Sequence, residues 1–192
     1  MWLLSTCKLG AFSMREIEKK WLEAGYQYFA NEGPKGLKIE QLSRKVGKNK
    51  SSFYHLFVDL EVFIDSLLKF HLKQAKIISE KESKAESEEE LIAIILEHKM
   101  DLLFNRQLRI HREQLRFEEC LRRISQFSTQ GLLPIWKNII SLSENTSLAL
   151  MMLHFGLDNF YLQISMETLN ESWLKAYFSD IRKMVVLFKR TF

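Results

Sequence analysis

The sequence predicts an all-α protein with about nine helices, and three observations support this fold class. Apolar residues recur at spacings of three and four along most of the chain, which is the period of one face of a helix. Only two prolines and seven glycines occur among the 192 residues, so long helices can form. Residues 37–57 combine two short helical patterns around a glycine, an arrangement typical of a helix-turn-helix.

The first helix should begin near residue 14 and end at about Asn31. Residues 1–13 show no periodicity and are expected to form a loose arm, whereas Ser13 and Glu16 have the spacing of a capping box. A Gly-Pro pair then stops the helix. The apolar stripe of this helix comprises Ile17, Trp21, Ala24 and Tyr28.

Residues 37–57 supply the next two helices. Gly47 can adopt the left-handed conformation that closes the first of them and reverses the chain. Asn49 can cap the second, Lys50–Leu56, because its side chain can accept a hydrogen bond from an amide in the first turn. The three N-terminal helices should share a core of Ile17, Trp21, Phe29, Ile39, Leu42, Val46, Phe53 and Phe57.

The second helix of this pair has the residue types that a DNA-recognition helix needs. Such a helix enters a major groove about 12 Å wide, so its leading side chains should be small or flexible. Serines can bond to base edges or phosphates, lysines can reach phosphates or guanine, and the helix N-terminus itself favours a phosphate. The predicted DNA-binding residues are Lys38, Lys48, Asn49, Lys50, Ser51, Ser52, Tyr54 and His55.

This stretch resembles the N-terminal domain of the TetR family of transcriptional regulators. The resemblance covers about the first third of the chain; beyond it, the chain is similar only in length and helical character. Lys38 stands where the family usually has a capping Ser or Thr, Ser51 replaces a common glycine, and Leu60 replaces a phosphate-contacting lysine. The matching residues are Ala24, Phe29, Gly33, Gly36, Ile39, Leu42, Val46, Gly47, Ser52, Phe53, Tyr54, His55, Phe57 and Glu61.

Charge and composition agree with a DNA-binding protein. Residues 1–57 carry ten Lys or Arg against five Glu, a net of +5, which leaves −1 for residues 58–192. Hydrophobic content of 46% with 27% charged residues is ordinary for a soluble globular protein. No apolar run approaches the roughly 20 residues of a membrane span, and two cysteines give no disulfide framework. We therefore expect a cytoplasmic protein that does not insert into a membrane.

The chain should divide into a DNA-binding domain at residues 1–58 and a larger helical domain at residues 59–192. Charged residues 80–90 are expected to form a solvated loop and the acidic first turn of a helix. Arginines share one face of the predicted helix near residues 106–127, where they could bind an anion or pair with Glu113, Glu118 and Glu119. The expected helices are one capped by Asp59 and reaching Lys81, then Glu88–Phe104, about Arg106–Phe127, Ile135–Leu142 after Gly131 and Pro134, one from Asn145 or Thr146 to about Thr168, and one opened by Asn170.

The last two helices carry apolar residues nearly all round, more than one chain of this size can cover. The resemblance implies that they pair with the same helices of a second copy in a four-helix bundle; the alternative is that both close the core of a monomer. The predicted dimer-interface residues are Met152, Gly156, Phe160, Trp173, Tyr177, Ile181 and Phe188.

The resemblance also implies a ligand cavity in the larger domain, from which an effector would change the separation of two DNA-binding heads. The candidate side chains are mostly aromatic, which favours an apolar or amphipathic effector, although each of them also suits an ordinary core. They are His98, Phe104, Phe117, Trp136, Met151, Phe155 and Tyr161.

We therefore predict a homodimeric, ligand-responsive regulator, a repressor that binds a near-palindromic operator and is released by its effector. The alternative is a TetR-like helical protein that binds a ligand or a partner and has weakened or lost operator binding, which Lys38 and Leu60 keep open. An enzyme is not expected, because the five histidines are scattered and no phosphate loop or nucleophile motif is present. Neither a metal site nor a cofactor is predicted.

Overall fold

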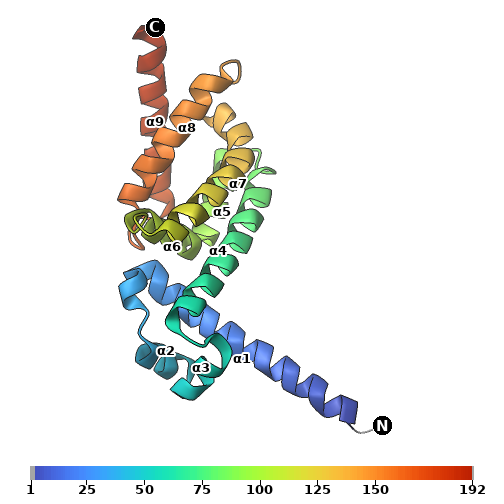
Figure 1. The fold of residues 1–192 in the computed structure, drawn as a ribbon. Coiled ribbons are helices and arrows are strands. Elements are labelled where there is room, and N and C mark those ends of the chain that lie inside the picture. The colour runs from blue at the N-terminus through green and yellow to red at the C-terminus, as the bar shows by residue number, and fades with distance from the viewer. Residues whose placement is uncertain (1–2, 192) are drawn as a thin grey trace. The chain divides into compact units, whose positions relative to one another are not determined.

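The computed structural model describes residues 3–191, with side chains from Arg15 to Phe188. Over these residues the chain consists of nine α-helices and one short 3-10 helix, so the predicted all-α class is confirmed (Figure 1). The chain divides into two compact units, residues 1–71 and 72–192. The sequence places the boundary at residue 58, whereas in the structure the first part of α4 packs with the first unit. Among the described residues, no helix combines the length and apolar character that crossing a membrane requires.

The first unit contains four helical elements and the start of a fifth. They are α1 (Leu3–Glu32), η1 (Pro34–Gly36), α2 (Ile39–Val46), α3 (Lys50–Phe57) and α4 (Leu60–Glu82), of which α4 continues into the second unit. The helix α1 includes residues 3–13, where we expected a loose arm. Because this stretch lacks proline, and each residue added to an existing helix gains one backbone hydrogen bond, helix propagation explains the difference.

An aromatic cluster forms the core of the first unit. The ring of Phe53 packs edge-on against Trp21 at 5.3 Å and against Phe63 at 5.1 Å, and Phe57 lies 4.8 Å from Phe63. Gly25 permits this packing, because a Cβ there would lie 2.3 Å from the Phe63 ring. Of the predicted core, Trp21, Phe29, Leu42, Phe53 and Phe57 are buried, whereas Ile17, Ile39 and Val46 are only half-buried.

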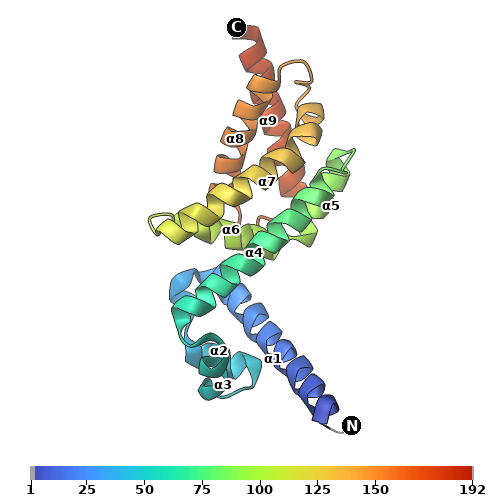
Figure 2. The same cartoon turned by 45° about the vertical axis from the view of Figure 1, so that its right-hand side comes forward.

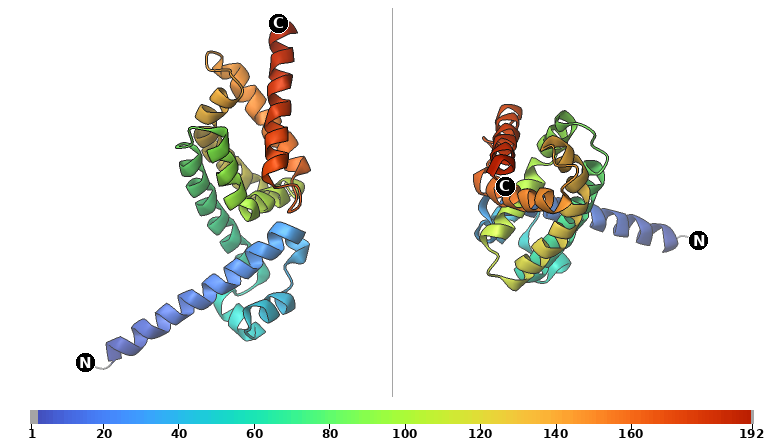
Figure 3. Two further views of the ribbon diagram at one scale, coloured as in Figure 1. Left: turned by 180° about the vertical axis from the view of Figure 1, so that it is seen from behind. Right: turned by 90° about the horizontal axis from the view of Figure 1, so that it is seen from above.

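The second unit contains the end of α4 and five further helices. The helices α8 and α9 lie side by side (Figures 2 and 3). Rings of Phe160, Trp173 and Tyr177 join them. The further helices are α5 (Glu88–Glu97), α6 (Lys99–Ile110), α7 (Leu115–Ile139), α8 (Thr146–Gln163) and α9 (Glu171–Thr191).

Helix boundaries in the middle of the chain differ from those predicted. The expected helix Glu88–Phe104 is broken at His98, and the expected helix Arg106–Phe127 is broken at residues 111–114. Conversely, α7 continues through Gly131 and Pro134, so the predicted separate helix Ile135–Leu142 is wrong. The glycine there serves packing, because a Cβ on Gly131 would lie 2.6 Å from the carbonyl oxygen of Ser79 in α4.

Four of the predicted N-caps are confirmed by side-chain hydrogen bonds. Each cap oxygen accepts from the backbone N–H three residues later, at distances of 2.8 to 3.0 Å. These bonds satisfy amides that would otherwise be unpaired at a helix start. The caps are Asn49 for α3, Asp59 for α4, Asn145 for α8 and Asn170 for α9.

Candidate functional site

The turn between α2 and α3 fixes the position of α3. Gly47 adopts the left-handed conformation at φ 70° and ψ 33°, as predicted. Its N–H and that of Lys48 donate to the carbonyl of Ser43 at 2.9 and 3.1 Å, which closes α2. The Asn49 side chain then accepts from the N–H of Ser52 at 3.0 Å, so α3 begins at Lys50.

The two faces of α3 differ in chemistry. Phe53 and Phe57 point inward and are buried, whereas the Tyr54 ring on the opposite side is 49% exposed. The polar face is therefore available at the surface of the first unit. Of the predicted DNA-binding residues, Ser52 is half-buried and the others are exposed, namely Lys38, Lys48, Asn49, Lys50, Ser51, Tyr54 and His55.

An ion pair that the sequence analysis missed crosses from α2 to α3. The ammonium of Lys50 donates to Oε1 of Glu40. This hydrogen bond lowers the pKa of the Glu40 carboxyl below its usual value. Both side chains are more than half exposed, so the pair is weak and Lys50 can exchange its partner for a phosphate. The only sequence signal was an acidic residue in the first turn of α2.

In the second unit, the predicted effector residues fall into two groups. Met151 and Phe155 are exposed and do not reach the core of this unit. The other five are buried, namely His98, Phe104, Phe117, Trp136 and Tyr161. The polar atoms of two of these buried residues already contact other groups of the chain. His98 contacts Asp101 through Nδ1 at 3.0 Å and Lys81 through Nε2 at 3.1 Å, and Trp136 donates to the carbonyl of Ala149.

Around Tyr161, the structure gathers polar residues that the sequence did not single out. Its hydroxyl accepts from Nδ2 of Asn105 at 2.9 Å, and the guanidinium of Arg109 lies 4.5 Å from the ring centre. Burial raises the pKa of Tyr161 to about 12 and the pKa of the nearby Glu82 carboxyl to about 8. Glu82 belongs to the charged run expected to be solvated, but it is buried at the end of α4.

Two arginines of the predicted arginine face form ion pairs with different helices. Arg109 donates to Asp158 of α8 at 2.6 Å, and Arg112 pairs with Glu118 at 3.1 Å. The Arg112–Glu118 pair agrees with the pairing alternative, whereas the partner of Arg109 is a carboxylate of α8 that the prediction did not name. Among the described residues, no group of three or more His, Cys, Asp or Glu side chains is arranged to hold a metal ion.

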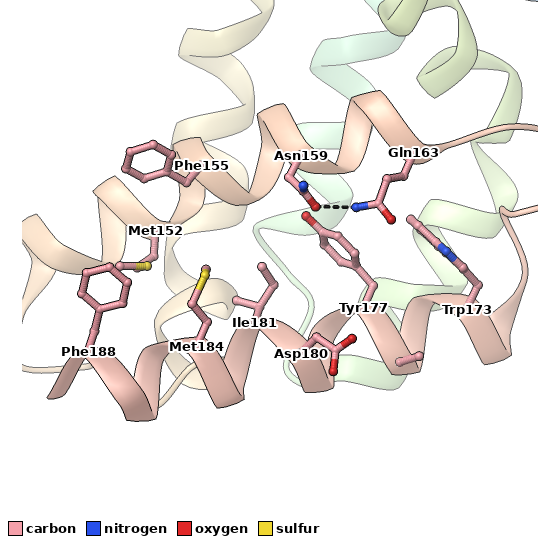
Figure 4. A pocket seen from close by; sticks show the side chains of 11 residues that line it. Met152, Phe155, Asn159, Gln163, Trp173, Tyr177, Asp180, Ile181, Met184 and Phe188 are labelled. Atoms are coloured by element: carbon pink, nitrogen blue, oxygen red, sulfur yellow. Dashed lines mark hydrogen bonds between the residues drawn. The ribbon is translucent and has the colours of Figure 1, made fainter. Parts of the chain in front are cut away.

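The helices α8 and α9 enclose an open groove of about 540 Å³ (Figure 4). Five of the predicted interface residues line it, namely Met152, Trp173, Tyr177, Ile181 and Phe188. Phe155 lies on the same face, although we expected it at the effector site. Gly156 and Phe160 are buried, and a Cβ on Gly156 would lie 3.3 Å from the Trp136 ring, so this glycine permits close packing within its own chain.

Similar proteins were found among solved structures and not by the comparisons of sequence. No protein-family model and no curated protein matches the sequence. Among solved structures, a chain from Mesorhizobium loti MAFF303099 assigned to the TetR family of transcriptional regulators matches with a TM-score of 0.55 at 14% identity, over 91% of this chain and 97% of that one. A second chain so assigned, from a Rhodococcus species, matches with a TM-score of 0.49 at 16% identity, over 92% and 98% of the two chains.

The chain has the TetR-family fold. Within this fold, the three departures from the TetR motif have visible local consequences. Lys38 makes no side-chain hydrogen bond to the start of α2, so that helix lacks the usual cap. Ser51 stands exposed on α3, and Leu60 is half-buried at the start of α4, where the side chain of Asp59 caps the helix.

Proposed function

We propose that this chain is a DNA-binding transcriptional regulator, and not an enzyme. The observation that carries the proposal is the position of α3 in a chain with the TetR-family fold: its aromatic residues fill the core and its polar face is exposed. A short exposed helix after a tight turn is the geometry that enters a major groove. The charge of the first 57 residues, net +5, favours association with a polyanion.

In this proposal, α3 lies in the major groove and its flanks contact the DNA backbone. Lys48 and the N-terminus of α3 would face phosphates, while Ser51 and Tyr54 would reach base edges or the backbone. Lys50 would leave Glu40 for a phosphate or for the O6 and N7 acceptors of guanine. Lys38, Asn49, Ser52 and His55 complete the proposed surface.

We further propose that two copies bind a near-palindromic operator through a dimer built on α8 and α9. The groove between these helices is lined mainly by apolar side chains, and Phe155 beside it is 63% exposed. A large apolar surface is unfavourable in water unless a partner covers it. A two-fold dimer would cover it with the identical surface of a second copy and would present two α3 helices to two half-sites.

The second unit would bind the effector. We propose that a small apolar or amphipathic molecule binds there and releases a repressor from its operator. Buried aromatic residues such as Phe104 and Phe117, together with the polar group of Tyr161, are suited to such a ligand. Release requires only that the ligand bind the two states of the protein with different affinity.

The test is DNA binding by the purified protein. Fluorescence anisotropy with a duplex from upstream of its own gene should show saturable binding that weakens steeply as salt rises. Replacing Lys50 and Tyr54 together by Ala should lower the affinity about tenfold or more, because a phosphate and a groove contact are both lost. Lys76→Ala removes an exposed cation of the second unit and serves as the matched control. Equal affinity of the double variant and the control would refute the assignment of α3.

A second candidate function is a ligand-binding protein with this fold that no longer binds an operator. Two departures from the TetR motif favour it: Lys38 leaves the start of α2 without its side-chain cap, and Leu60 stands in place of a phosphate-contacting lysine. Absence of any DNA complex at low salt, in a protein that still dimerises and binds a small molecule, would select this alternative.

A further inference from the structure

The junction between α5 and α6 holds a buried histidine that contacts a charged side chain of α4. His98 is 9% exposed and lies between Glu97, the last residue of α5, and Lys99, the first residue of α6. Its Nδ1 lies 3.0 Å from Oδ2 of Asp101, and its Nε2 lies 3.1 Å from Nζ of Lys81 in the last turn of α4. The two ring nitrogens therefore join the end of α4 to the junction.

The contact with Lys81 determines which ring nitrogen carries the proton. An ammonium has three donors and no acceptor, so Nε2 of His98 must accept from Nζ of Lys81. The single proton of the neutral ring is then on Nδ1, from which it is donated to the carboxylate of Asp101. The hydrogen bond between Lys81 and His98 thus exists only while the ring is neutral.

A carboxylate at the same junction is placed to accept from the charged ring. Oε2 of Glu97 lies 3.9 Å from Nε2 of His98, while Oε1 of Glu97 accepts from Lys81 at 2.6 Å. A proton on Nε2 would place a donor 3.1 Å from the ammonium, where like charges repel. One ammonium against two carboxylates, those of Glu97 and Asp101, gives a net of −1, so one added proton brings the group to zero.

We propose that Lys81, Glu97, His98 and Asp101 form a pH-dependent latch between α4 and the α5–α6 junction. With the ring neutral, Lys81 is held by Nε2 and by Glu97, and the end of α4 is fixed. With the ring charged, Nε2–H is donated to Glu97 and Lys81 turns to solvent, which already reaches 38% of its side chain. Asp101 accepts from Nδ1–H in both states, so the ring itself stays in place.

Neighbouring groups of the latch keep their charge between pH 7 and pH 5. Burial raises the pKa of Glu82 at the end of α4 to about 8, and that of Tyr161 in α8, on which the Asp101 carboxylate also acts, to about 12. Both therefore stay protonated. The hydrogen bond from Lys81 lowers the pKa of the Glu97 carboxyl, which stays ionised. Histidine is the side chain that ordinarily takes up a proton in this range, so acid would act on the ring.

Hydrogen exchange at the end of α4 measures the latch. The amide of Ser83 donates to the carbonyl of Ser79 at 3.0 Å, so its exchange reports the opening of this end of the helix. In the full-length wild type, protection of a peptide that spans this bond should fall about threefold or more from pH 7 to pH 5.5, after correction for the intrinsic effect of pH on exchange. Unchanged protection over this range would overturn the proposal.

Variants hold the latch in one state or the other. In His98→Gln the amide can accept from Lys81 and donate to Asp101 without titrating, so protection should stay high at both pH values. Lys81→Met removes the ammonium, so protection should be low at both. Lys84→Met, at an exposed lysine just after α4, is the matched control and should behave as the wild type does.

Circular dichroism confirms the fold of each variant. A pH dependence that persists in folded His98→Gln or Lys81→Met would exclude the latch, and Lys81→Met decides alone if His98→Gln does not fold. Proton placement has its own test, because ¹H–¹⁵N spectra of the imidazole rings at pH 7.5 should show the His98 proton on Nδ1. A proton on Nε2 instead would contradict the hydrogen bond from Lys81 and sink the proposal.

A final measurement asks whether the latch affects DNA binding, a step that rests on the proposed function. The other end of α4 carries Phe63, which packs against Phe53 of α3 at 5.1 Å, so release of α4 should make α3 less well ordered for DNA. Affinity for the duplex should therefore gain about threefold less on acidification from pH 7 to pH 5.5 in the wild type than in His98→Gln.

The two failures can be told apart. If protection depends on pH as expected but the two proteins gain equal affinity, or if no DNA complex forms at all, the latch stands and its effect on DNA binding fails. If DNA binds and protection does not change with pH, the regulator stands and the latch fails.

Discussion

The phenol oxygen of Tyr26 lies 2.6 Å from Nδ1 of His71, and this contact joins α1 to α4 inside the first unit. The Tyr26 ring also packs edge-on against Phe70 at 5.1 Å. Burial lowers the pKa of His71 to about 3, because the surroundings disfavour the charged imidazolium. The middle of α4 is thus joined to α1 through a buried histidine whose neutral form is favoured.

The first prediction concerns acid stability. Because the pKa of His71 falls from 6.5 to about 3 on folding, the unfolded chain binds the extra proton between these values. This residue therefore makes the free energy of unfolding decrease as pH falls below 6.5, by up to about 1.4 kcal/mol per pH unit. Urea unfolding at pH 7, 6 and 5 should show a weaker decrease for His71→Gln than for the wild type. The exposed His55→Gln variant should behave like the wild type.

The second prediction concerns Glu82, which should make stability decrease as pH rises. The pKa of Glu82 rises from 4.5 to about 8 on folding, so the native state holds the extra proton in this window. Its contribution to stability is therefore lost as pH rises from 4.5 to 8, again by up to about 1.4 kcal/mol per pH unit. The same unfolding series between pH 6 and 8 should lose this slope in Glu82→Gln but keep it in Glu80→Gln. A slope that persists in Glu82→Gln would mean that another group titrates.

The third prediction tests the contact between α4 and α7. Gly131→Ala would place a Cβ 2.6 Å from the carbonyl oxygen of Ser79 and 2.9 Å from its Cα. Backbone atoms cannot turn away as a flexible side chain can, so we expect destabilisation of about 1–3 kcal/mol. Thermal unfolding should show a lower midpoint for this variant than for Gln130→Ala, an exposed substitution in the same helix. A midpoint equal to the control would show that the two helices can separate without loss.

The fourth prediction concerns the carboxylate beside the proposed recognition helix. Glu40→Gln removes the partner of Lys50 and a negative charge that would face DNA. We expect DNA affinity at low salt to rise about threefold to tenfold, and affinity for unrelated sequences to rise at least as much. Anisotropy titrations with two duplexes measure both values. Glu80→Gln controls for the change in net charge, and equal affinity of the two variants would show that Lys50 is not limiting.

The fifth prediction concerns the α8–α9 face. Phe155→Lys places a charge on an exposed apolar residue that lines the groove, so it should shift a dimer towards monomer. Sedimentation equilibrium at several concentrations measures the dissociation constant, which should increase about tenfold or more. Ile110→Lys, on an exposed site of α6, should leave it unchanged. A Phe155→Lys protein that dimerises as the wild type does would place the interface elsewhere.

The turn and the helix caps could be predicted from the sequence, because short-range interactions determine them. The turn at Gly47 and the caps Asn49, Asp59, Asn145 and Asn170 each follow from one residue and its near neighbours, and all are present in the structure. The alternation of aromatic and polar residues in α3 likewise shows which side is buried. These features need no information from distant parts of the chain.

The features that were missed depend on contacts between distant residues. The break at His98 carries no glycine or proline, and its side chain bonds to Lys81 and Asp101. In the sequence, Gly131 suggests the end of a helix, but in the structure it permits close packing of α7 against α4. Glu82 lies in a run of charge that suggests solvent, and only its place three residues after the packed Ser79 shows that it faces inward.

The ion pair between Lys50 and Glu40 changes how the electrostatics of this protein should be counted. In the proposed DNA complex, Lys50 would leave the carboxylate of Glu40 for a phosphate, and this exchange would release fewer small ions than the binding of an unpaired lysine. A tally of cations on the α3 face therefore overstates the entropy gained on association. In that complex every duplex would have to replace Glu40 as the partner of Lys50, so the ion pair would weaken binding to all sequences and favour those that offer Lys50 a better acceptor.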